Sequence, residues 1–326
     1  MRARWIFAIV AVTLLAGMTV PERQARLNPL IDLLEGDQPV FGLYAPANRR
    51  GGRDGGDAAP ARTPAELAQE ALAYDRTDFL FDGSMEGDFD RGYESYAAFV
   101  GAMAQAGALQ RSPAPRLRHP LVVKTPEIAP DPALAAQRIA RQLDLGTTGI
   151  VFVGVESAEE VRTGLAAMRF RSQGGTRPDP VGSAPEYWGV SEAEYREKAD
   201  LWPLNPRGEL VNWTIVESRE GLENIREIAA VEGIGVLFPG AGTLRGVFSS
   251  TGPDGQRVFD EQGWESAIQQ VLAACKEFDV ACGYPATAND IEMRMDQGFS
   301  VFIMGWGEPG FAAIDIGRKA AGRSND

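Results

Sequence analysis

Short apolar runs and amphipathic stretches alternate along most of this chain. Runs that are apolar at nearly every position are typical of a parallel sheet covered on both faces. Eight such runs predict strands over 40–44, 78–82, 121–125, 149–155, 210–217, 235–239, 281–285 and 300–305. The amphipathic stretches predict helices over 64–74, 93–106, 132–143, 158–168, 219–230, 261–278, 288–296 and 309–321. Gly107, Gly146 and Gly298 stand where helices commonly end in the left-handed conformation.

Eight strand–helix units in one chain predict an α/β fold, a single-domain (β/α)8 TIM barrel over residues 26–326. An open doubly wound sheet is the alternative, but no Gly-x-Gly-x-x-Gly motif follows the first strand. Two stretches interrupt the alternation. Residues 48–61 are rich in Gly, Arg and Asp and predict a loop. Residues 170–207 predict a long insertion or lid, and their tyrosines and tryptophans favour an ordered lid or an oligomer contact over a disordered linker.

The first 25 residues differ from the rest of the chain. Arg2 and Arg4 precede the apolar run 5–20, and a polar stretch follows it. This pattern is typical of an export signal, and it predicts a periplasmic protein or one anchored by this segment. A buried N-terminal helix is the alternative. Cys275 and Cys282 could pair in an oxidising compartment, but they lie on successive elements, and we interpret both as unpaired core residues.

Charge and composition limit the ligands that the protein can bind and the side chains that it can use in catalysis. The 326 residues include 32 basic and 45 acidic side chains, a net charge of −13, which is unfavourable for binding nucleic acid. One histidine and two cysteines exclude a Cys/His zinc site. The histidine, His119, starts a predicted strand, which is the stability face of a barrel. Any catalysis must therefore use carboxylates, Lys or Arg, backbone amides or a metal held by oxygen.

The carboxyl ends of barrel strands carry the active site in this fold. Reading these ends in order gives a short set of polar groups: Asp82, Ser84, Glu86, Lys124, Glu127, Glu156 and Glu217. Carboxylates that converge there favour Mg²⁺ or Mn²⁺. The amides of Gly240, Ala241 and Gly242 could hold a substrate carboxylate. Tyr284 and Trp306 end the last two strands and are candidate substrate contacts, with packing as the alternative.

Several segments resemble the HpcH/HpaI aldolase family, in matching order and spacing over roughly residues 27–322. They are DFLFDGSMEGDFD (78–90), PLVVKTPE (120–127), LDLGTTGIVFVGVESAEE (143–160), IVESREGLENIREIAAVEGIGVLFPGAGTL (215–244), LAACKEFDVACG (272–283) and DQGFSVFIMGWGEPG (296–310). The resemblance implies a metal-dependent barrel that assembles as trimers or hexamers. It also implies cleavage or formation of C–C bonds in 4-hydroxy-2-oxo acids, with pyruvate enolate as the usual intermediate.

Four positions of the resemblance carry the chemistry, and three are changed in this chain. Glu217 matches one of the family's two metal-binding carboxylates, whereas Gly242 falls on the second, an aspartate. Lys124 stands where an arginine holds the substrate carboxylate, and a lysine offers only a point charge there. The family's DxEHxP histidine, its base, is absent from 82–87. Glu86 could replace it, and Glu86, Glu127 or Glu156 could supply the missing metal ligand.

We therefore expect a carbon–carbon lyase of the aldolase type that acts on a small carboxylated 2-oxo or hydroxy acid through a metal-stabilised enolate. Glu217 and Glu156 would hold the metal, Lys124 would anchor the substrate, and Glu86, with Asp82 beside it, would move the proton. A Schiff base at Lys124 is a metal-free variant. Two alternatives stay open: an inactive exported barrel that binds a ligand or partner, and a lyase or isomerase whose aromatic substrate meets Trp202, Trp213 or Trp306.

Overall fold

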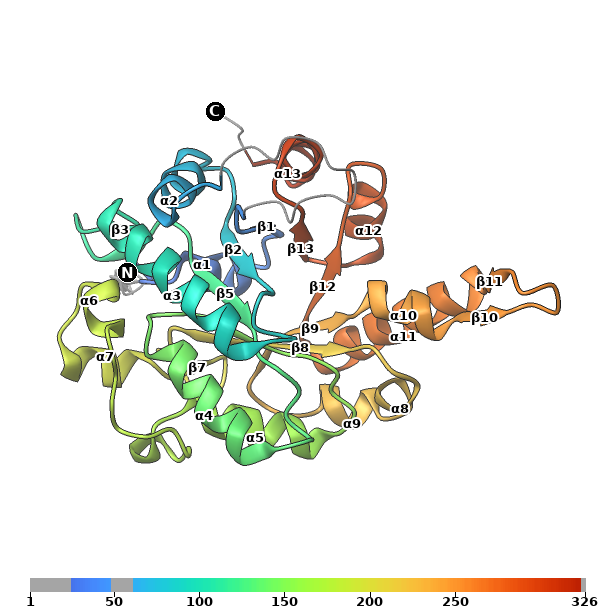
Figure 1. Ribbon diagram of the computed structural model, residues 1–326, viewed down its shortest axis with the longest axis horizontal. Coiled ribbons are helices and arrows are strands. Elements are labelled where there is room, and N and C mark those ends of the chain that lie inside the picture. The colour runs from blue at the N-terminus through green and yellow to red at the C-terminus, as the bar shows by residue number, and fades with distance from the viewer. Residues whose placement is uncertain (1–24, 48–60, 324–326) are drawn as a thin grey trace, which may run out of the picture.

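In a computed structural model that describes residues 25–47 and 61–323, eight parallel strands close into a barrel (Figure 1). The strands are β1 (Val40–Tyr44), β2 (Phe79–Asp82), β5 (Leu121–Lys124), β6 (Gly149–Phe152), β8 (Leu210–Val216), β9 (Ile234–Pro239), β12 (Ala281–Pro285) and β13 (Val301–Met304). Their order is β6-β5-β2-β1-β13-β12-β9-β8, and β8 pairs back onto β6 to close the ring. The predicted TIM barrel is confirmed, with each strand within two or three residues of its predicted bounds.

The helices that follow the strands cover the outside of the barrel. They are α2 (Pro64–Ala73), α3 (Phe89–Gln105), α4 (Pro132–Leu143), α5 (Ala158–Met168), α8 (Arg219–Glu223), α9 (Ile225–Ala229), α11 (Glu261–Phe278), α12 (Ile291–Gln297) and α13 (Glu308–Ala320). The single helix predicted over 219–230 is wrong in one respect, because Asn224 separates α8 from α9. Gly107, Gly146 and Gly298 adopt positive φ angles of 88°, 98° and 109°, as predicted.

The barrel interior is filled by large side chains that face glycines on neighbouring strands. A Cβ on Gly42 would lie 2.1 Å from the Phe79 ring, and one on Gly283 would lie 1.9 Å from the Phe238 ring. Trp213 is fully buried among them, with its ring 5.0 Å from that of Phe79. The short helix α1 (Pro29–Glu35), which the sequence pattern did not predict, packs Leu30, Ile31 and Leu34 into this inner core.

The insertion at 170–207 packs at the amino-terminal ends of the strands. It contains a 3-10 turn (Arg171–Gln173), α6 (Ala184–Trp188), α7 (Glu192–Lys198) and β7 (Leu201–Trp202). Trp188 is fully buried and donates from Nε1 to the Gly146 carbonyl, which precedes β6 (2.8 Å). Trp202 donates to Glu35 on α1 (3.0 Å). The expected insertion is present, but its interpretation as a lid is wrong, because its aromatic side chains are anchored on the side opposite the strand ends that carry the candidate site.

An arm after β9 was also not predicted. It consists of α10 (Ala241–Val247) and a hairpin of β10 (Ser249–Thr251) and β11 (Arg257–Phe259), and the hairpin stands away from the body of the molecule (Figure 1). A smaller hairpin pairs β3 (Leu109–Gln110) with β4 (Arg116–Leu117). Strands of two or three mostly polar residues give too weak an alternation for a sequence pattern to reveal them.

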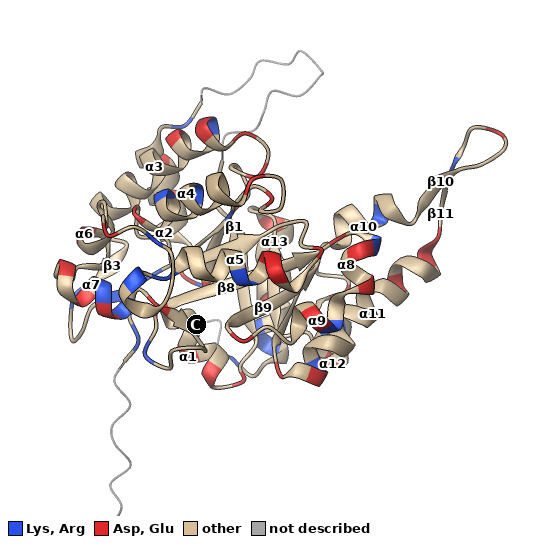
Figure 2. Ribbon diagram, turned by 90° about the horizontal axis from the view of Figure 1, so that it is seen from below, with Lys and Arg blue, Asp and Glu red and all other residues tan. Residues whose placement is uncertain are grey.

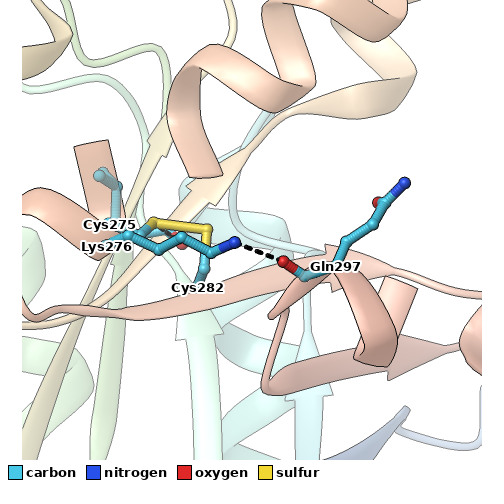
Figure 3. The surroundings of a disulfide bond; sticks show 5 residues. Cys275, Lys276, Cys282 and Gln297 are labelled. Carbon is cyan, nitrogen blue, oxygen red and sulfur yellow. Dashed lines mark hydrogen bonds between the residues drawn. A yellow bond between two sulfur atoms is a disulfide. The ribbon is translucent and has the colours of Figure 1, made fainter. Parts of the chain in front are cut away.

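A disulfide joins Cys275 at the end of α11 to Cys282 on β12 (Figure 3). Their Cα atoms are 5.7 Å apart, within the usual range for a disulfide. Both residues belong to the buried core, as expected. The interpretation of them as unpaired was wrong, because the short turn after α11 returns the chain directly alongside the helix end. Lys276, the next residue, donates to the Gln297 carbonyl (2.6 Å), which holds the same helix end against α12.

Two predictions fall on residues that are not described. The proposed export segment, apart from Ala25, and the loop predicted over 48–61, apart from Ala61, lie outside the described ranges. Within 25–47 and 61–323, helices are either too short or too polar to cross a bilayer.

Candidate active site

The side chains that face the axis at the carboxyl end of the barrel follow from strand alternation. Because successive side chains point to opposite faces, inward Phe81, Val122 and Ile215 predict inward positions two residues later. These positions are Gly83, Lys124 and Glu217. A Cβ on Gly83 would lie 3.6 Å from the Tyr44 ring and 3.7 Å from Cδ of Lys124, so this end of the barrel brings β1, β2 and β5 together. Tyr44 and Lys124 therefore meet above the inner core.

Glu217 is held at the end of β8 by two glycines. Its Oε1 accepts a hydrogen bond from the Gly154 amide (3.0 Å). On the other side, a Cβ on Gly240 would lie 2.4 Å from Cβ and 2.5 Å from Oε2 of Glu217. Only a residue without a side chain leaves room for the carboxylate there. The turn after β9 thus makes room for the Glu217 carboxylate at Gly240. The sequence had instead predicted that the backbone amides of this turn bind substrate.

Glu127 is the second carboxylate at this position. A Cβ on Gly154 would lie 3.0 Å from Oε1 of Glu127, and Gly154 has a φ of 60°, in the left-handed region that favours glycine. Glu127 and Glu217 therefore both lie beside Gly154, from the segments that follow β5 and β8. Gly154 was missed as a site residue. Its signal in the sequence is an isolated glycine between Val153 and Val155, which marks a close backbone approach.

Lys124 and Glu86 form an ion pair on the neighbouring side of the ring. Nζ of Lys124 donates to Oε2 of Glu86 (2.8 Å), and the Lys124 side chain is only 15% exposed. The Lys124 carbonyl accepts from Gln142 on α4, which fixes the backbone at this strand end (2.8 Å). Partial burial raises the pKa of the Tyr44 hydroxyl, while the charge of Lys124 opposes that rise. Tyr44 was not among the predicted site residues, although it ends the first predicted strand.

Asp82 lies one position out of step with the inward residues. Its Oδ1 accepts from the amide (2.8 Å) and the hydroxyl (2.6 Å) of Ser84 and so shapes the turn that carries Glu86. Burial raises the pKa of the Asp82 carboxyl. Met85 falls in the stretch where the family has its histidine. It is fully buried, and its sulfur accepts a hydrogen bond from Nε2 of Gln142 (3.4 Å). Neither side chain extends over the barrel axis, and Glu86 is the exposed acid of this turn.

The remaining predicted residues lie at the margin of the site or outside it. Tyr284 is buried between the barrel and its helices, where its hydroxyl accepts from Arg294 (3.1 Å). Trp306 donates to Glu70 on α2 (2.6 Å) and packs edge-on against Phe311. The Glu156 carbonyl accepts from Asn224 (2.9 Å), and its carboxylate contributes to raising the pKa of Glu160, for which burial is the larger cause. The Ala241 carbonyl accepts from Trp264 (2.8 Å), and Gly242 is exposed.

The carboxylates of Glu127 and Glu217 suit a hard divalent ion that takes only one or two of its ligands from the protein. Among the described residues, no group of three or more His, Cys, Asp or Glu side chains could hold a metal. Glu127 and Glu217 offer two carboxylates beside Gly154. Mg²⁺ is commonly bound by one or two carboxylates together with waters and substrate oxygens. Two carboxylates at an open strand end therefore fit such an ion, which would keep positions free for a substrate.

The family model described as HpcH/HpaI aldolase/citrate lyase matches residues 106–307. The chain belongs to this family. Members of it generally depend on a divalent metal, and the name covers aldolase and lyase activity on keto acids. The matched segment begins before β5 and ends after β13, so it contains Lys124, Glu127 and Glu217.

Individual relatives are distant. A hydroxypyruvate/pyruvate aldolase of Paraburkholderia phytofirmans is 24% identical over 83% of this chain and 88% of its own. A 2-dehydro-3,6-dideoxy-6-sulfogluconate aldolase of Pseudomonas putida is 26% identical over 53% of this chain, which spans only 61% of that relative. A family protein from Burkholderia cenocepacia J2315 superimposes with a TM-score of 0.63 at 23% identity, over 85% of this chain and 92% of that one. This last likeness concerns the fold alone.

Proposed function

We propose that this protein is a carbon–carbon lyase of the aldolase type whose substrate is a small 4-hydroxy-2-oxo acid. The observation that carries the proposal is the inward ring of strand ends, in which the family's carboxylate Glu217 is kept and Lys124 stands on β5 with Glu86 as its partner. Similarity to aldolases that act on keto acids supports the same class of substrate.

We propose Glu217 and Glu127 as the residues that hold the divalent ion, of the Mg²⁺ or Mn²⁺ type. Glu127 takes the role expected of Glu156, because Glu127 is the carboxylate that flanks Gly154 together with Glu217. When bound, such an ion would polarise the 2-oxo group of the substrate. Oxygen-only ligands favour this class of metal over zinc or copper.

The chain's own residues then have distinct tasks. Lys124 exchanges Glu86 for the carboxylate of the substrate, which a lysine can hold as a point charge. Glu86, released from its ion pair, accepts the proton of the C4 hydroxyl while the C3–C4 bond breaks. The bonding electrons go to C3, C4 becomes the carbonyl of an aldehyde, and C3 then receives a proton to complete the shorter 2-oxo acid. Asp82 positions the turn of Glu86 through Ser84.

Release of pyruvate from a panel of 4-hydroxy-2-oxo acids, coupled to lactate dehydrogenase, tests this proposal. We expect Glu86→Gln to lower kcat by about 10²-fold or more, as loss of a general acid–base group does. Glu217→Gln should also lower kcat, because it removes a carboxylate ligand of the ion that would polarise the 2-oxo group. Lys124→Met should mainly raise KM, and Lys124→Arg should restore it. Glu192→Gln on α7, an exposed residue paired with Arg196, is the control and should have no effect. Full activity of Glu217→Gln would refute the assignment.

The alternatives find less support in the placement of their residues. Nζ of Lys124 is engaged by Oε2 of Glu86 (2.8 Å), whereas a Schiff-base nucleophile needs a free amine that can reach the substrate carbonyl. Borohydride trapping with pyruvate, followed by mass spectrometry, would detect that route. For an aromatic substrate, Trp213 is enclosed in the inner core and Trp202 lies near α1. The insertion remains a surface that an inactive binding protein could use.

Localisation and assembly are further parts of the proposal. We propose export, supported by the basic and apolar start of the chain and by the disulfide, since disulfides persist mainly in oxidising compartments. Fusion of residues 1–30 to alkaline phosphatase tests it, with activity expected only if the segment directs export. Family membership supports a homo-oligomer, a trimer or hexamer, and light scattering measures its mass.

A further inference from the structure

The arm carries a hollow of about 450 Å³ that is open to solvent, and none of the residues assigned to the proposed reaction lines it. One wall is α10, with Gly242, Thr243, Arg245 and Gly246, and the other is the hairpin, with Ser249, Arg257 and Phe259. Figure 2 shows the hairpin projecting from the body of the molecule beside α10. Gly242, which lines the hollow, is only two residues beyond the Gly240 that makes room for Glu217.

Two arginines face this hollow without an acidic partner. Cζ of Arg245 lies 4.0 Å from the centre of the Phe259 ring, so the guanidinium lies over the ring face in a cation–π contact. A terminal nitrogen of Arg257 lies 4.0 Å from where a Cβ on Gly246 would be, which brings it over α10 from the opposite strand. In the part of the chain that the structure describes, neither guanidinium has a carboxylate within ion-pair distance.

The nearby acids are engaged elsewhere. Asp260 accepts from the Gly263 amide at the start of α11 (2.8 Å), and Asp254 accepts from the Gln256 amide at the tip of the hairpin (3.0 Å). A third arginine, Arg219, stacks on Phe248 and donates to the Val247 carbonyl (3.3 Å), which adds positive charge at the base of the arm. The arm thus carries three arginines on a chain whose net charge is −13.

We infer that the hollow between α10 and the β10–β11 hairpin is an oxyanion site in which Arg245 and Arg257 bind a carboxylate or phosphate group. Guanidinium groups match the two oxygens of such an anion, and paired donors on opposite walls give it a defined position. The hydroxyls of Thr243 and Ser249 line the same hollow, and the Ser249 hydroxyl donates to the Arg245 carbonyl (2.7 Å). Gly242 and Gly246 leave the floor free of side chains.

The anion could come from two sources that share this chemistry. It could be a free small acid, or the far end of a substrate whose 2-oxo acid portion lies beside Glu217; the second source rests on the proposed function. Inorganic phosphate probes the first source and does not require the reaction. Comparison of 2-oxoglutarate with pyruvate probes the second, because these 2-oxo acids differ by a second carboxylate.

Calorimetric titration of the full chain at low ionic strength tests the inference. We expect phosphate to bind the wild type, with affinity lowered about tenfold by Arg245→Gln or Arg257→Gln and more in the double variant, since one charged hydrogen bond contributes about a factor of ten. Arg171→Gln removes the same charge from an exposed arginine of the insertion and should bind phosphate as the wild type does. Circular dichroism confirms that each variant is folded.

The titrations distinguish a site for a free anion from a site for the far end of the substrate, and both from the absence of a site. Phosphate binding that is lost in the double variant and unchanged by saturating pyruvate establishes a free-anion site. Tighter binding of 2-oxoglutarate than of pyruvate, with the difference abolished in the double variant, establishes the far end of the substrate as the ligand. The inference is overturned if neither ligand distinguishes the double variant from Arg171→Gln. Absence of aldol activity would leave the phosphate result intact, so the two proposals can fail separately.

Discussion

The contact between Gly240 and Glu217 gives the most direct test of the site geometry. In Gly240→Ala, the new Cβ would lie 2.4 Å from Cβ of Glu217, whereas ordinary contact begins at 3.4 Å. The missing 1.0 Å cannot come from a flexible side-chain tip, because Cβ of Glu217 is fixed to the end of β8. The φ of Gly240 is −71°, so alanine adds no backbone strain, and the whole effect reports the overlap.

We expect the free energy of unfolding, measured by urea titration, to fall by about 1–3 kcal/mol, the usual cost of inserting a methyl group into packed structure. The hydrogen bond from the Gly154 amide to Glu217 should be disturbed as well. Gly101→Ala, on the exposed face of α3 with open space around it, is the control and should stabilise the protein by about 0.5–1 kcal/mol. If Gly240→Ala were as stable as the wild type, Glu217 could not lie where the structure has it.

Further predictions concern stability. Replacing Cys275 and Cys282 by alanine should lower the free energy of unfolding by about 2.5 kcal/mol, from the entropy of a loop with a separation of seven residues; an unchanged urea midpoint would speak against the bond, and intact mass without reductant detects it directly. Trp188→Ala should cost about 3–5 kcal/mol while kcat of the folded fraction is retained, because the insertion lies far from the strand ends; lost activity in a stable variant would contradict this. Burial lowers the pKa of His119 to about 4, so protonation favours the unfolded chain, and stability should decline as pH falls from 6.5 towards 4 by up to about 1.4 kcal/mol per pH unit. His119→Gln should remove that part of the pH dependence, and parallel urea–pH profiles for the two proteins would show the prediction to be wrong.

Much of the barrel could be predicted because its signal is local. Strands such as 40–44 and 281–285 are apolar at consecutive positions, and α4, α5 and α11 begin at capping residues that the sequence displays. The sequence pattern did not predict the arm or α1, because their strands and helix are short. Packing rather than periodicity decides the structure of such short elements. The disulfide between Cys275 and Cys282 was not predicted, because pairing depends on how the turn after α11 brings the helix and β12 together.

The candidate site was predicted in part, for a related reason. Strand alternation places Lys124 and Glu217 on the axis, and both were identified at strand ends. The same alternation turns Tyr284 toward the helix layer. Its position at a strand end therefore does not make it a residue of the site. The proposal of Glu127 in place of Glu156 could not come from the sequence, because it rests on which side chain lies beside the left-handed Gly154.

Binding of a divalent ion by Glu127 and Glu217 is the central claim, and calorimetric titration of metal-free protein with Mn²⁺ tests it most directly. The account predicts one site in the wild type, with affinity lowered about tenfold or more in both Glu217→Gln and Glu127→Gln, and unchanged in Glu159→Gln, an exposed residue of α5. Titration with Mg²⁺ should follow the same order. Mn²⁺ binding that is absent from the wild type, or that survives intact in both site variants, would contradict it.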